Sequence, residues 1–243
     1  MKIKLDEGFL FGLGAFETVA VYGGRPIFLK QHLERLAKGL EFLGIPRRIT
    51  EEEVFRFLER QSLPSSGALK IAVSEENVLF LTRKNPYTKA DYEKGFTVDF
   101  AHIRRNETSP FVYHKTLNYG ECIRERRMAA AKGLNEAVFL NSRGEICEGT
   151  ASNIFFVRNG RIITPDISCG LLPGIIRGYL TEHYGIEEEK LCRDDLERFD
   201  ECFLSNSLMG VMPVLKFGNH QFADRKTADK IGEEYRREYC PFW

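Results

Sequence analysis

The first hundred residues alternate between apolar runs with strand periodicity and two amphipathic helical stretches. Alternating apolar positions predict a strand over residues 16–22, and Gly23-Gly24 predicts a turn into a second strand over 25–28. Leu33, Leu36, Leu40 and Leu43 recur at helical spacing and predict a helix over 30–44 that ends at Gly44. A second helix is predicted over 51–61, followed by strands over 68–73, 78–82 and 96–103.

Residues 104–113 lose this periodicity and contain Pro110, which predicts an interdomain loop. Beyond the loop we expect helices over 117–133, 172–184 and 226–239, and strands over 136–140, 152–157, 161–164 and 201–204. Asn159-Gly160 predicts a hairpin turn between two of these strands. Helices segregated from consecutive strands indicate an α+β fold, with domains over 1–103 and 114–243.

Composition narrows the classes of partner. The 243 residues carry 35 basic and 35 acidic side chains, and this zero net charge removes the usual argument for nucleic acid or an anionic membrane. No apolar run reaches the roughly 20 residues of a membrane span, and no secretory core follows the N-terminal lysines. The six cysteines show no C-x-x-C pair and the five histidines no metal-ligand spacing. We expect reduced thiols in a cytoplasmic protein without a metal.

Four short motifs follow one another along almost the whole chain. They are Phe16-Glu17-Thr18 with His32-x-x-Arg35-Leu36, Lys115-x-x-Asn118-Tyr119, Glu148-Gly149-x-x-x-Asn153-Ile154-Phe155, and Leu172-Pro173-Gly174-Ile175-x-Arg177. In this order and spacing the chain resembles the class IV aminotransferase family, the fold type IV enzymes that depend on pyridoxal 5′-phosphate. The resemblance implies two α/β domains of the D-amino-acid aminotransferase-like fold. It also implies a homodimer.

The resemblance assigns roles at the cofactor ring. Lys115 carries the cofactor as a Schiff base and then moves protons, whereas a lone lysine before a helix is more commonly a solvated surface residue. Glu148 is the carboxylate that keeps the ring nitrogen protonated. Tyr119 resembles the tyrosine that hydrogen-bonds the ring hydroxyl, and a half-buried helix aromatic is the competing interpretation.

The cofactor phosphate needs positive charge and unpaired N–H groups. Arg35 resembles the family's phosphate arginine, and we expect its neighbour His32 to lie on the helix surface. The start of a helix at Gly174 is suited to an anion. The full cofactor-binding set on this resemblance is Arg35, Lys115, Tyr119, Glu148, Asn153, Gly174, Ile175, Ile176, Ser205, Asn206 and Ser207. For the last three residues a simple polar loop is the alternative.

Two features resemble aminodeoxychorismate lyases within the family. Thr18 occupies the position of a threonine thought to assist proton transfer, although a β-branched residue also suits any strand. Arg104 and Arg105 precede Lys115 in a segment that resembles lyases, and either could supply a cation for a substrate carboxylate; a solvated basic loop is the alternative. Phe16 is expected beside the substrate.

The implied reaction is the pyridoxal-phosphate-dependent cleavage of 4-amino-4-deoxychorismate to pyruvate and 4-aminobenzoate, a step of folate biosynthesis. Lys115 would remove a proton, and Lys115 or Thr18 would return one to the departing carbon. The alternative is an aminotransferase for D-amino or branched-chain amino acids. A third reading is a protein that binds the cofactor without turnover. The chain starts near the turn Asp6-Glu7-Gly8, where relatives have two earlier strands, so we expect a shortened N-terminal sheet.

Overall fold

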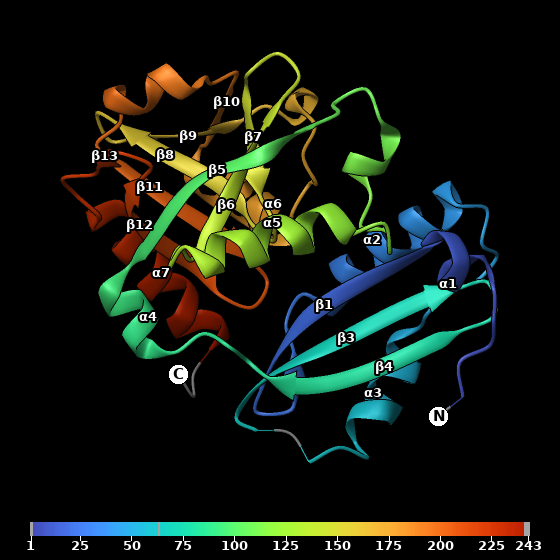
Figure 1. Cartoon of the computed structure of the whole chain (residues 1–243). Helices are drawn as coiled ribbons and strands as arrows, with labels where there is room; N and C mark the ends of the chain where they lie inside the picture. The colour runs from blue at the N-terminus through green and yellow to red at the C-terminus, as the bar shows by residue number, and fades with distance from the viewer. Residues whose placement is uncertain (1, 63, 241–243) are drawn as a thin grey trace. The chain divides into compact units, whose positions relative to one another are not determined.

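The chain forms two compact units in the computed structural model, which describes residues 2–62 and 64–240 (Figure 1). The first unit comprises Met1–Pro86, His114–Tyr119 and Tyr239–Trp243, and the second comprises Tyr87–Tyr113 and Gly120–Glu238. The predicted boundary at residue 103 differs from this division. Strand β5 (Phe96–Arg105) pairs in parallel with strands of the second unit, so it groups with that unit.

The first unit contains an antiparallel sheet of four strands in its described residues, in the order β2-β1-β3-β4. The hairpin turn and both amphipathic helices predicted for this region are confirmed. The elements are α1 (Glu7–Phe11), β1 (Gly14–Tyr22), β2 (Arg25–Pro26), α2 (Leu29–Phe42), α3 (Glu51–Leu58), β3 (Ser66–Ser74) and β4 (Val78–Lys84).

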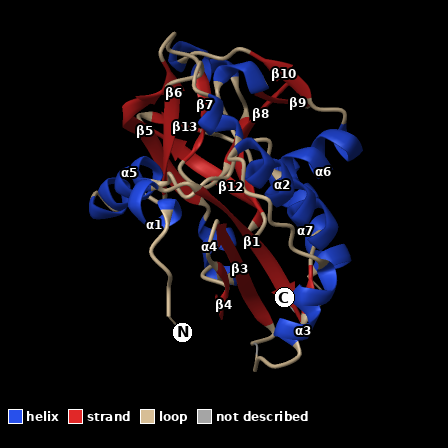
Figure 2. Cartoon of the chain, turned by 90° about the vertical axis from the view of Figure 1, so that its right-hand side faces the viewer, coloured by secondary structure: helices blue, strands red, loops and turns tan. Residues whose placement is uncertain are grey.

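One face of this sheet is covered by α2 and α3, which lie on the same side of the strands in Figure 2. Leu36 and Leu40 of α2 pack with Val19 of β1 and Leu69 of β3 in one buried apolar cluster. Because side chains alternate across a strand, Phe16, Thr18 and the other even-numbered residues of β1 point to the opposite face. The sheet therefore presents Phe16 and Thr18 on the face away from the helical core, whereas Glu17 between them faces α2.

The second unit is built on a mixed sheet, for which the described residues give nine strands. The strand order is β10-β9-β8-β11-β12-β5-β6-β7, with β13 paired to β12. Its helices are α4 (Lys89–Lys94), α5 (Gly120–Ala131), α6 (Ile175–Tyr184), α7 (Lys226–Tyr239) and the 3₁₀ turns Pro110–Tyr113, Ile167–Cys169 and Arg193–Arg198. Its remaining strands are β6 (Glu136–Asn141), β7 (Ile146–Gly149), β8 (Asn153–Arg158), β9 (Arg161–Pro165), β10 (Glu187–Glu189), β11 (Glu201–Asn206), β12 (Gly210–Phe217) and β13 (His220–Gln221).

The predicted α+β class and the Asn159-Gly160 hairpin are confirmed, since β8 and β9 pair antiparallel across that turn. Strand β12 was not predicted, because Pro213 lies within it and proline is disfavoured inside sheets. The structure accommodates Pro213 because β5 pairs with β12 only from Val214 onward. Among the described helices, none has the length and apolar character needed to cross a membrane.

Candidate functional site

Lys115 lies on an extended segment that runs beside β1. The Phe16 N–H donates to the Lys115 carbonyl at 2.9 Å, and the Leu117 N–H donates to the Gly14 carbonyl at 2.8 Å. This pairing sets Thr116 opposite Ala15 and hence places Lys115 on the Phe16 face of the sheet. The position lies five residues before α5, so the lysine is held by the sheet edge and not by a helix.

Two aromatic rings surround the Lys115 amine. Its Nζ atom lies 4.6 Å from the centre of the Phe16 ring and 5.1 Å from the centre of the Tyr119 ring. The two rings pack edge to face, with centres 5.1 Å apart and planes at 84°. Aromatic faces attract an ammonium group and also exclude water from it. The amine is therefore oriented in a partly apolar setting, which suits a lysine that must act as a nucleophile and base.

Thr18 shares this face with two basic residues that the sequence analysis did not single out. Thr18 lies directly opposite Lys70 on β3, and Arg83 of β4 lies opposite Ala68 on the same face. The Nζ of Lys70 is 4.7 Å from the Phe16 ring centre. Burial, and then the charge of Arg83, lower the pKa of Lys70. A lysine amid the apolar run Ala-Leu-Lys-Ile-Ala was the available signal, although strands often carry one.

These two cations have no acidic partner among the residues that the structure describes, and no carboxylate contributes to the pKa of Lys70. Neighbouring like charges are unfavourable, and an anion bound between them would relieve the repulsion. The face that carries Lys115 and Thr18 therefore also has the charge to receive one or two carboxylates.

Glu17 of β1 fixes the side chain of Arg35, which lies on α2. Arg35 Nε and Nη2 donate to the two oxygens of Glu17 at 2.7 and 2.8 Å, and His32 Nδ1 lies 2.6 Å from Glu17 Oε2. His32 is fully buried, so the expectation of a surface histidine was wrong. His32 precedes Leu33, the first leucine of the predicted apolar stripe, so the pattern did not include it. The carboxylate that His32 contacts lies on another element, and only the fold brings the two together.

Glu148 of β7 occupies a buried position in the second unit. Arg105 Nη2 donates to Glu148 Oε1 at 2.7 Å, and the Leu172 N–H donates to Oε2 at 3.2 Å. The side chains of Arg105 and Glu148 are only 12% and 7% exposed. The carboxylate is thus oriented by an ion pair with Arg105 and by a backbone N–H.

The predicted basic loop at Arg104 and Arg105 is instead the end of β5, where they pair with Leu140 and Asn141. Arg105 lies in the ion pair with Glu148 and over the Phe139 ring, 4.4 Å from its centre. Arg104 is exposed and donates to the Asn141 carbonyl at 3.0 Å. A substrate role for either arginine stays a prediction, and the charge of Arg105 is largely engaged inside its own unit.

The start of α6 forms a compact cradle in the second unit. Gly174 is the N-cap and has no side-chain cap, so the first-turn amides of Ile175 and Ile176 have no acceptor from a capping side chain. A Cβ on Gly174 would lie 2.0 Å from Asn153 Oδ1, which shows how closely the strand residue approaches the helix start. Asn153 Nδ2 donates to the Leu172 carbonyl at 2.9 Å. This is a geometry suited to an anion such as phosphate.

Ser205 and its neighbours lie beside this cradle. Ser205 is directly opposite Asn153 on adjacent strands, and its hydroxyl is buried with no hydrogen-bond partner among the described residues. Asn206 Oδ1 accepts from the N–H groups of Leu208 and Met209, both at 2.9 Å, and so shapes the turn that contains Ser207. A buried hydroxyl without a partner among the described residues could donate a hydrogen bond to a bound oxyanion.

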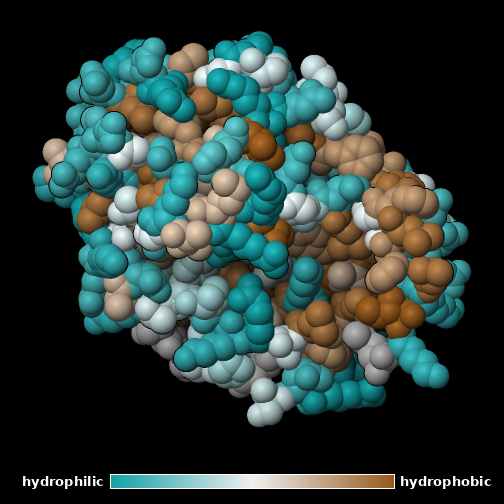
Figure 3. All heavy atoms as spheres, in the orientation of Figure 1, coloured by the Kyte–Doolittle hydropathy of each residue, from teal (hydrophilic) through white to brown (hydrophobic). Residues whose placement is uncertain are grey.

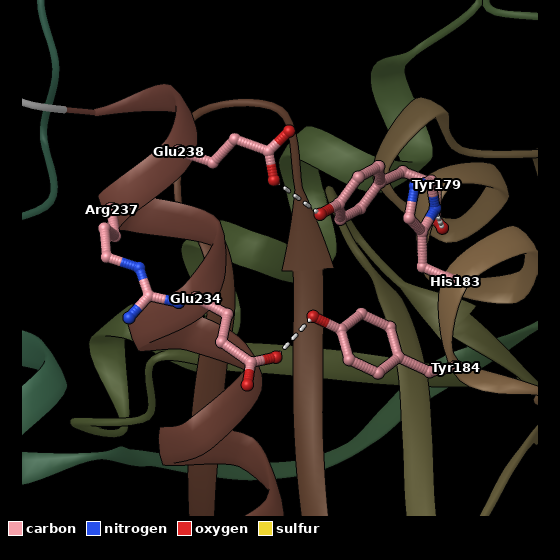
Figure 4. A pocket seen from close by; sticks show the side chains of 6 residues that line it. All are labelled: Tyr179, His183, Tyr184, Glu234, Arg237 and Glu238. Carbon is pink, nitrogen blue, oxygen red and sulfur yellow. Dashed lines mark hydrogen bonds between the residues drawn. The ribbon is translucent and has the colours of Figure 1, made fainter.

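A cavity of about 500 Å³ also opens between α6 and α7 (Figure 4). Tyr184 donates to Glu234 at 2.9 Å and Tyr179 to Glu238 at 3.4 Å, so these carboxylates are already hydrogen-bonded. His183 and Arg237 complete the lining. None of the motif residues lines this cavity.

Taken unit by unit, the donor sets just described fit parts of pyridoxal phosphate. The first unit offers an amine between two aromatic rings and an arginine, and the second offers a buried carboxylate and a helix start with a buried hydroxyl nearby. No group of three or more His, Cys, Asp or Glu side chains in the described part of the chain is arranged to hold a metal ion.

Comparisons with known proteins identify the family. The model for amino-transferase class IV matches residues 14–217. An aminodeoxychorismate lyase of Bacillus subtilis is 27% identical over 87% of this chain and 80% of its own length. A putative branched-chain-amino-acid aminotransferase of Methanocaldococcus jannaschii is 28% identical over 95% of this chain and 88% of its own.

Among solved structures, a putative 4-amino-4-deoxychorismate lyase of Legionella pneumophila superposes with a TM-score of 0.88. It is 28% identical, and the match covers 98% of this chain and 96% of that one. The predicted family resemblance is thus confirmed, together with the fold type IV architecture. The chain belongs to the class IV aminotransferases, a family of enzymes that depend on pyridoxal phosphate.

Proposed function

We propose that this protein binds pyridoxal 5′-phosphate and cleaves 4-amino-4-deoxychorismate to pyruvate and 4-aminobenzoate, the step that feeds folate synthesis. The observation that carries the proposal is the face of the first sheet, where Lys115 and Thr18 accompany the unpaired cations Lys70 and Arg83. Two cations match a substrate with two carboxylates. The lyase names of the Bacillus and Legionella proteins agree with this choice.

Contacts within the chain support each proposed cofactor-binding role. When bound, the cofactor supplies an electron-withdrawing ring that makes the carbon next to the substrate nitrogen acidic. Lys115 would hold the cofactor through its amine, and Glu148, ion-paired with Arg105, would be the carboxylate beside the ring nitrogen. The cradle at Gly174 and the guanidinium of Arg35 bind the phosphate. Tyr119, which packs edge to face with Phe16, would hydrogen-bond the ring hydroxyl.

The chain's own groups then move the proton. Once the substrate amine has displaced it from the cofactor, the freed amine of Lys115 would remove the proton from the amine-bearing ring carbon, and the bond from the ring to the enolpyruvyl oxygen would break to release the enolate of pyruvate. A proton returned by Lys115 or by the Thr18 hydroxyl to the terminal carbon would convert this enolate to pyruvate, and the ring would become aromatic 4-aminobenzoate. Lys70 and Arg83 hold the carboxylates during these steps. No second substrate is consumed, so the atoms of the substrate are all accounted for in the two products.

The alternative is an aminotransferase for D-amino or branched-chain amino acids. The Methanocaldococcus relative, with its aminotransferase name, favours it. Lys115 would then pass the proton from the substrate to the cofactor instead of to a departing carbon. A keto acid would be required to complete the cycle.

The test is to incubate the protein, reconstituted with pyridoxal phosphate, with 4-amino-4-deoxychorismate and no keto acid. The lyase is expected to give equal amounts of pyruvate and 4-aminobenzoate, and Lys115→Ala is expected to give neither. Borohydride reduction followed by peptide mass spectrometry should place the cofactor on Lys115. Product formation only after a keto acid is added would establish the aminotransferase, and label on another lysine would refute the assignment.

We also propose a homodimer in the cytoplasm. Helix α1 contains no buried residue, and Phe9, Leu10 and Phe11 are 71%, 55% and 63% exposed. Figure 3 shows apolar side chains gathered on the surface around this helix. An apolar patch of this kind marks a protein interface. The six cysteines are unbridged, as expected in a reducing compartment.

The double variant Phe9→Ser, Phe11→Ser is the matching test of self-association. Light scattering after size-exclusion chromatography is expected to show a dimer for the native chain and a smaller species for the variant. A native chain that elutes as a monomer at micromolar concentration would contradict the homodimer.

A further inference from the structure

Three polar side chains lie between β1 and α2, in a layer that is otherwise apolar. Glu17 and His32 are both 0% exposed at the side chain, and Arg35 is 13% exposed. The neighbours of Glu17 along the same strand face, Ala15 and Val19, belong to the buried apolar cluster. Replacing such an ionic group by apolar residues commonly leaves a protein as stable or more so. The group therefore calls for an explanation other than stability.

Glu17 fixes the plane of the Arg35 guanidinium. Nε and Nη2 each donate to a different oxygen of the carboxylate, at 2.7 and 2.8 Å, and this two-bond geometry allows one orientation of the planar group. Burial opposes ionisation of Glu17, but the Arg35 charge and its hydrogen bonds outweigh burial and keep the pKa of Glu17 below its usual value.

His32 in turn fixes the carboxylate. His32 Nδ1 lies 2.6 Å from Glu17 Oε2, and because a carboxylate oxygen accepts, Nδ1–H is the donor in this contact. Burial lowers the pKa of His32, against the opposing effect of Glu17. With this oxygen held by both His32 and Arg35, rotation of the carboxylate about its last bond would break two hydrogen bonds at once. The order of contacts runs from His32 to Glu17 to Arg35.

We propose that Glu17 and His32 are positioning residues that set the Arg35 guanidinium in the orientation that binds the cofactor phosphate. This rests on the proposed binding of pyridoxal phosphate. The two residues touch neither cofactor nor substrate and act only through Arg35. An arginine that is held rigid loses less conformational entropy when the anion binds, which is how pre-organisation raises affinity.

The experiment compares two ligands that differ only in the phosphate: pyridoxal 5′-phosphate and pyridoxal. Their dissociation constants are measured by absorbance titration on the native chain, on Glu17→Gln and on His32→Gln. We expect Glu17→Gln to weaken binding of the phosphate form by about 10- to 100-fold, the range for losing the partner of a ligating side chain, and to leave pyridoxal unchanged. His32→Gln should keep most of the affinity of the native chain, because the glutamine amide can still donate to the Glu17 carboxylate.

The matched control is Glu125→Gln. Glu125 is also a buried carboxylate that contacts a histidine, with His102 Nδ1 at 3.1 Å, but it lies in the second unit outside the motif residues. Its substitution should change neither constant. Phosphorus NMR of the bound phosphate gives a second readout, with a chemical shift expected to move in Glu17→Gln alone.

The outcomes separate this inference from the proposal on which it rests. Equal weakening of both ligands in Glu17→Gln, or no change in either, would overturn the positioning role while leaving cofactor binding intact. A native chain that binds neither ligand would overturn the proposed function itself, and the positioning role with it. Should Glu17→Gln fail to fold, His32→Ala carries the test, because the same selective loss of the phosphate form is expected from it.

Discussion

Gly174→Ala tests the cradle at the start of α6. The backbone angles of Gly174, φ −70° and ψ 148°, suit alanine as well as glycine, so the substitution introduces no backbone strain. Its effect comes from space, because the new Cβ would lie 2.0 Å from Asn153 Oδ1 and 3.2 Å from Asn153 Cγ. No side chain tolerates that approach, and Asn153 must therefore move.

The cost has two parts. Asn153 is only 6% exposed and its Nδ2 donates to the Leu172 carbonyl at 2.9 Å, so moving it forfeits a hydrogen bond of about 0.5–1.5 kcal/mol. Forcing an extra carbon into a packed site costs about 1–3 kcal/mol more. Alanine also lowers the conformational entropy of the unfolded chain relative to glycine, which stabilises the folded state by about 0.4–1 kcal/mol. The free energy of unfolding is thus expected to fall by about 0.5–4 kcal/mol, or roughly 1–16 °C in Tm.

Gly178→Ala supplies the matched control on the same helix. Gly178 is exposed, and a Cβ there would meet nothing within 4 Å, so alanine should raise the free energy of unfolding by about 1 kcal/mol through helix propensity. Thermal unfolding and titration with pyridoxal phosphate are measured for both variants. We expect at least about a tenfold weaker cofactor affinity for Gly174→Ala alone. Equal Tm shifts, or an unchanged affinity in Gly174→Ala, would refute the cradle.

Two further predictions concern acid stability and substrate choice. The hydrogen bond from Ser74 is the chief cause that lowers the pKa of Asp6 to about 2, so Asp6 stabilises the fold above its usual pKa of 3.8 and this stabilisation is lost as pH falls from there toward 2. Urea midpoints between pH 2 and 5 should depend less on pH in Asp6→Asn, and identical slopes would contradict this. Lys70→Met should raise KM for a dicarboxylate substrate by about 10-fold or more with a smaller change in kcat, while Lys38→Met on the exposed side of α2 should change neither. An unchanged KM in Lys70→Met would exclude a carboxylate contact.

The local pattern predicted the elements well. Helix α7 was predicted with its observed bounds, and the leucine stripe gave α2 to within two residues, because side-chain periodicity and glycine stops depend on neighbouring residues alone. Short elements such as α1 and β10 were missed, since too few residues lie in them to show a period. Periodicity did not predict the motif residues; family resemblance did.

Partners across the chain were beyond the reach of the pattern. His32 looked like a surface residue until the fold set Glu17 of β1 against it, and Arg105 looked like part of a loop until β5 joined the second sheet and reached Glu148. Lys70 became notable only when strand register placed it opposite Thr18. A shift of register by one residue would send each such side chain to the other face.

The amino-acid sequence by itself determined the fold class and the family, and it predicted the lysine, carboxylate and helix start that we propose bind the cofactor. Tertiary structure decided which charges meet: the buried order from His32 through Glu17 to Arg35, the pairing of Arg105 with Glu148, and the two cations beside Thr18. The reason is physical, because periodicity is written in adjacent residues while strand pairing joins residues far apart in the chain.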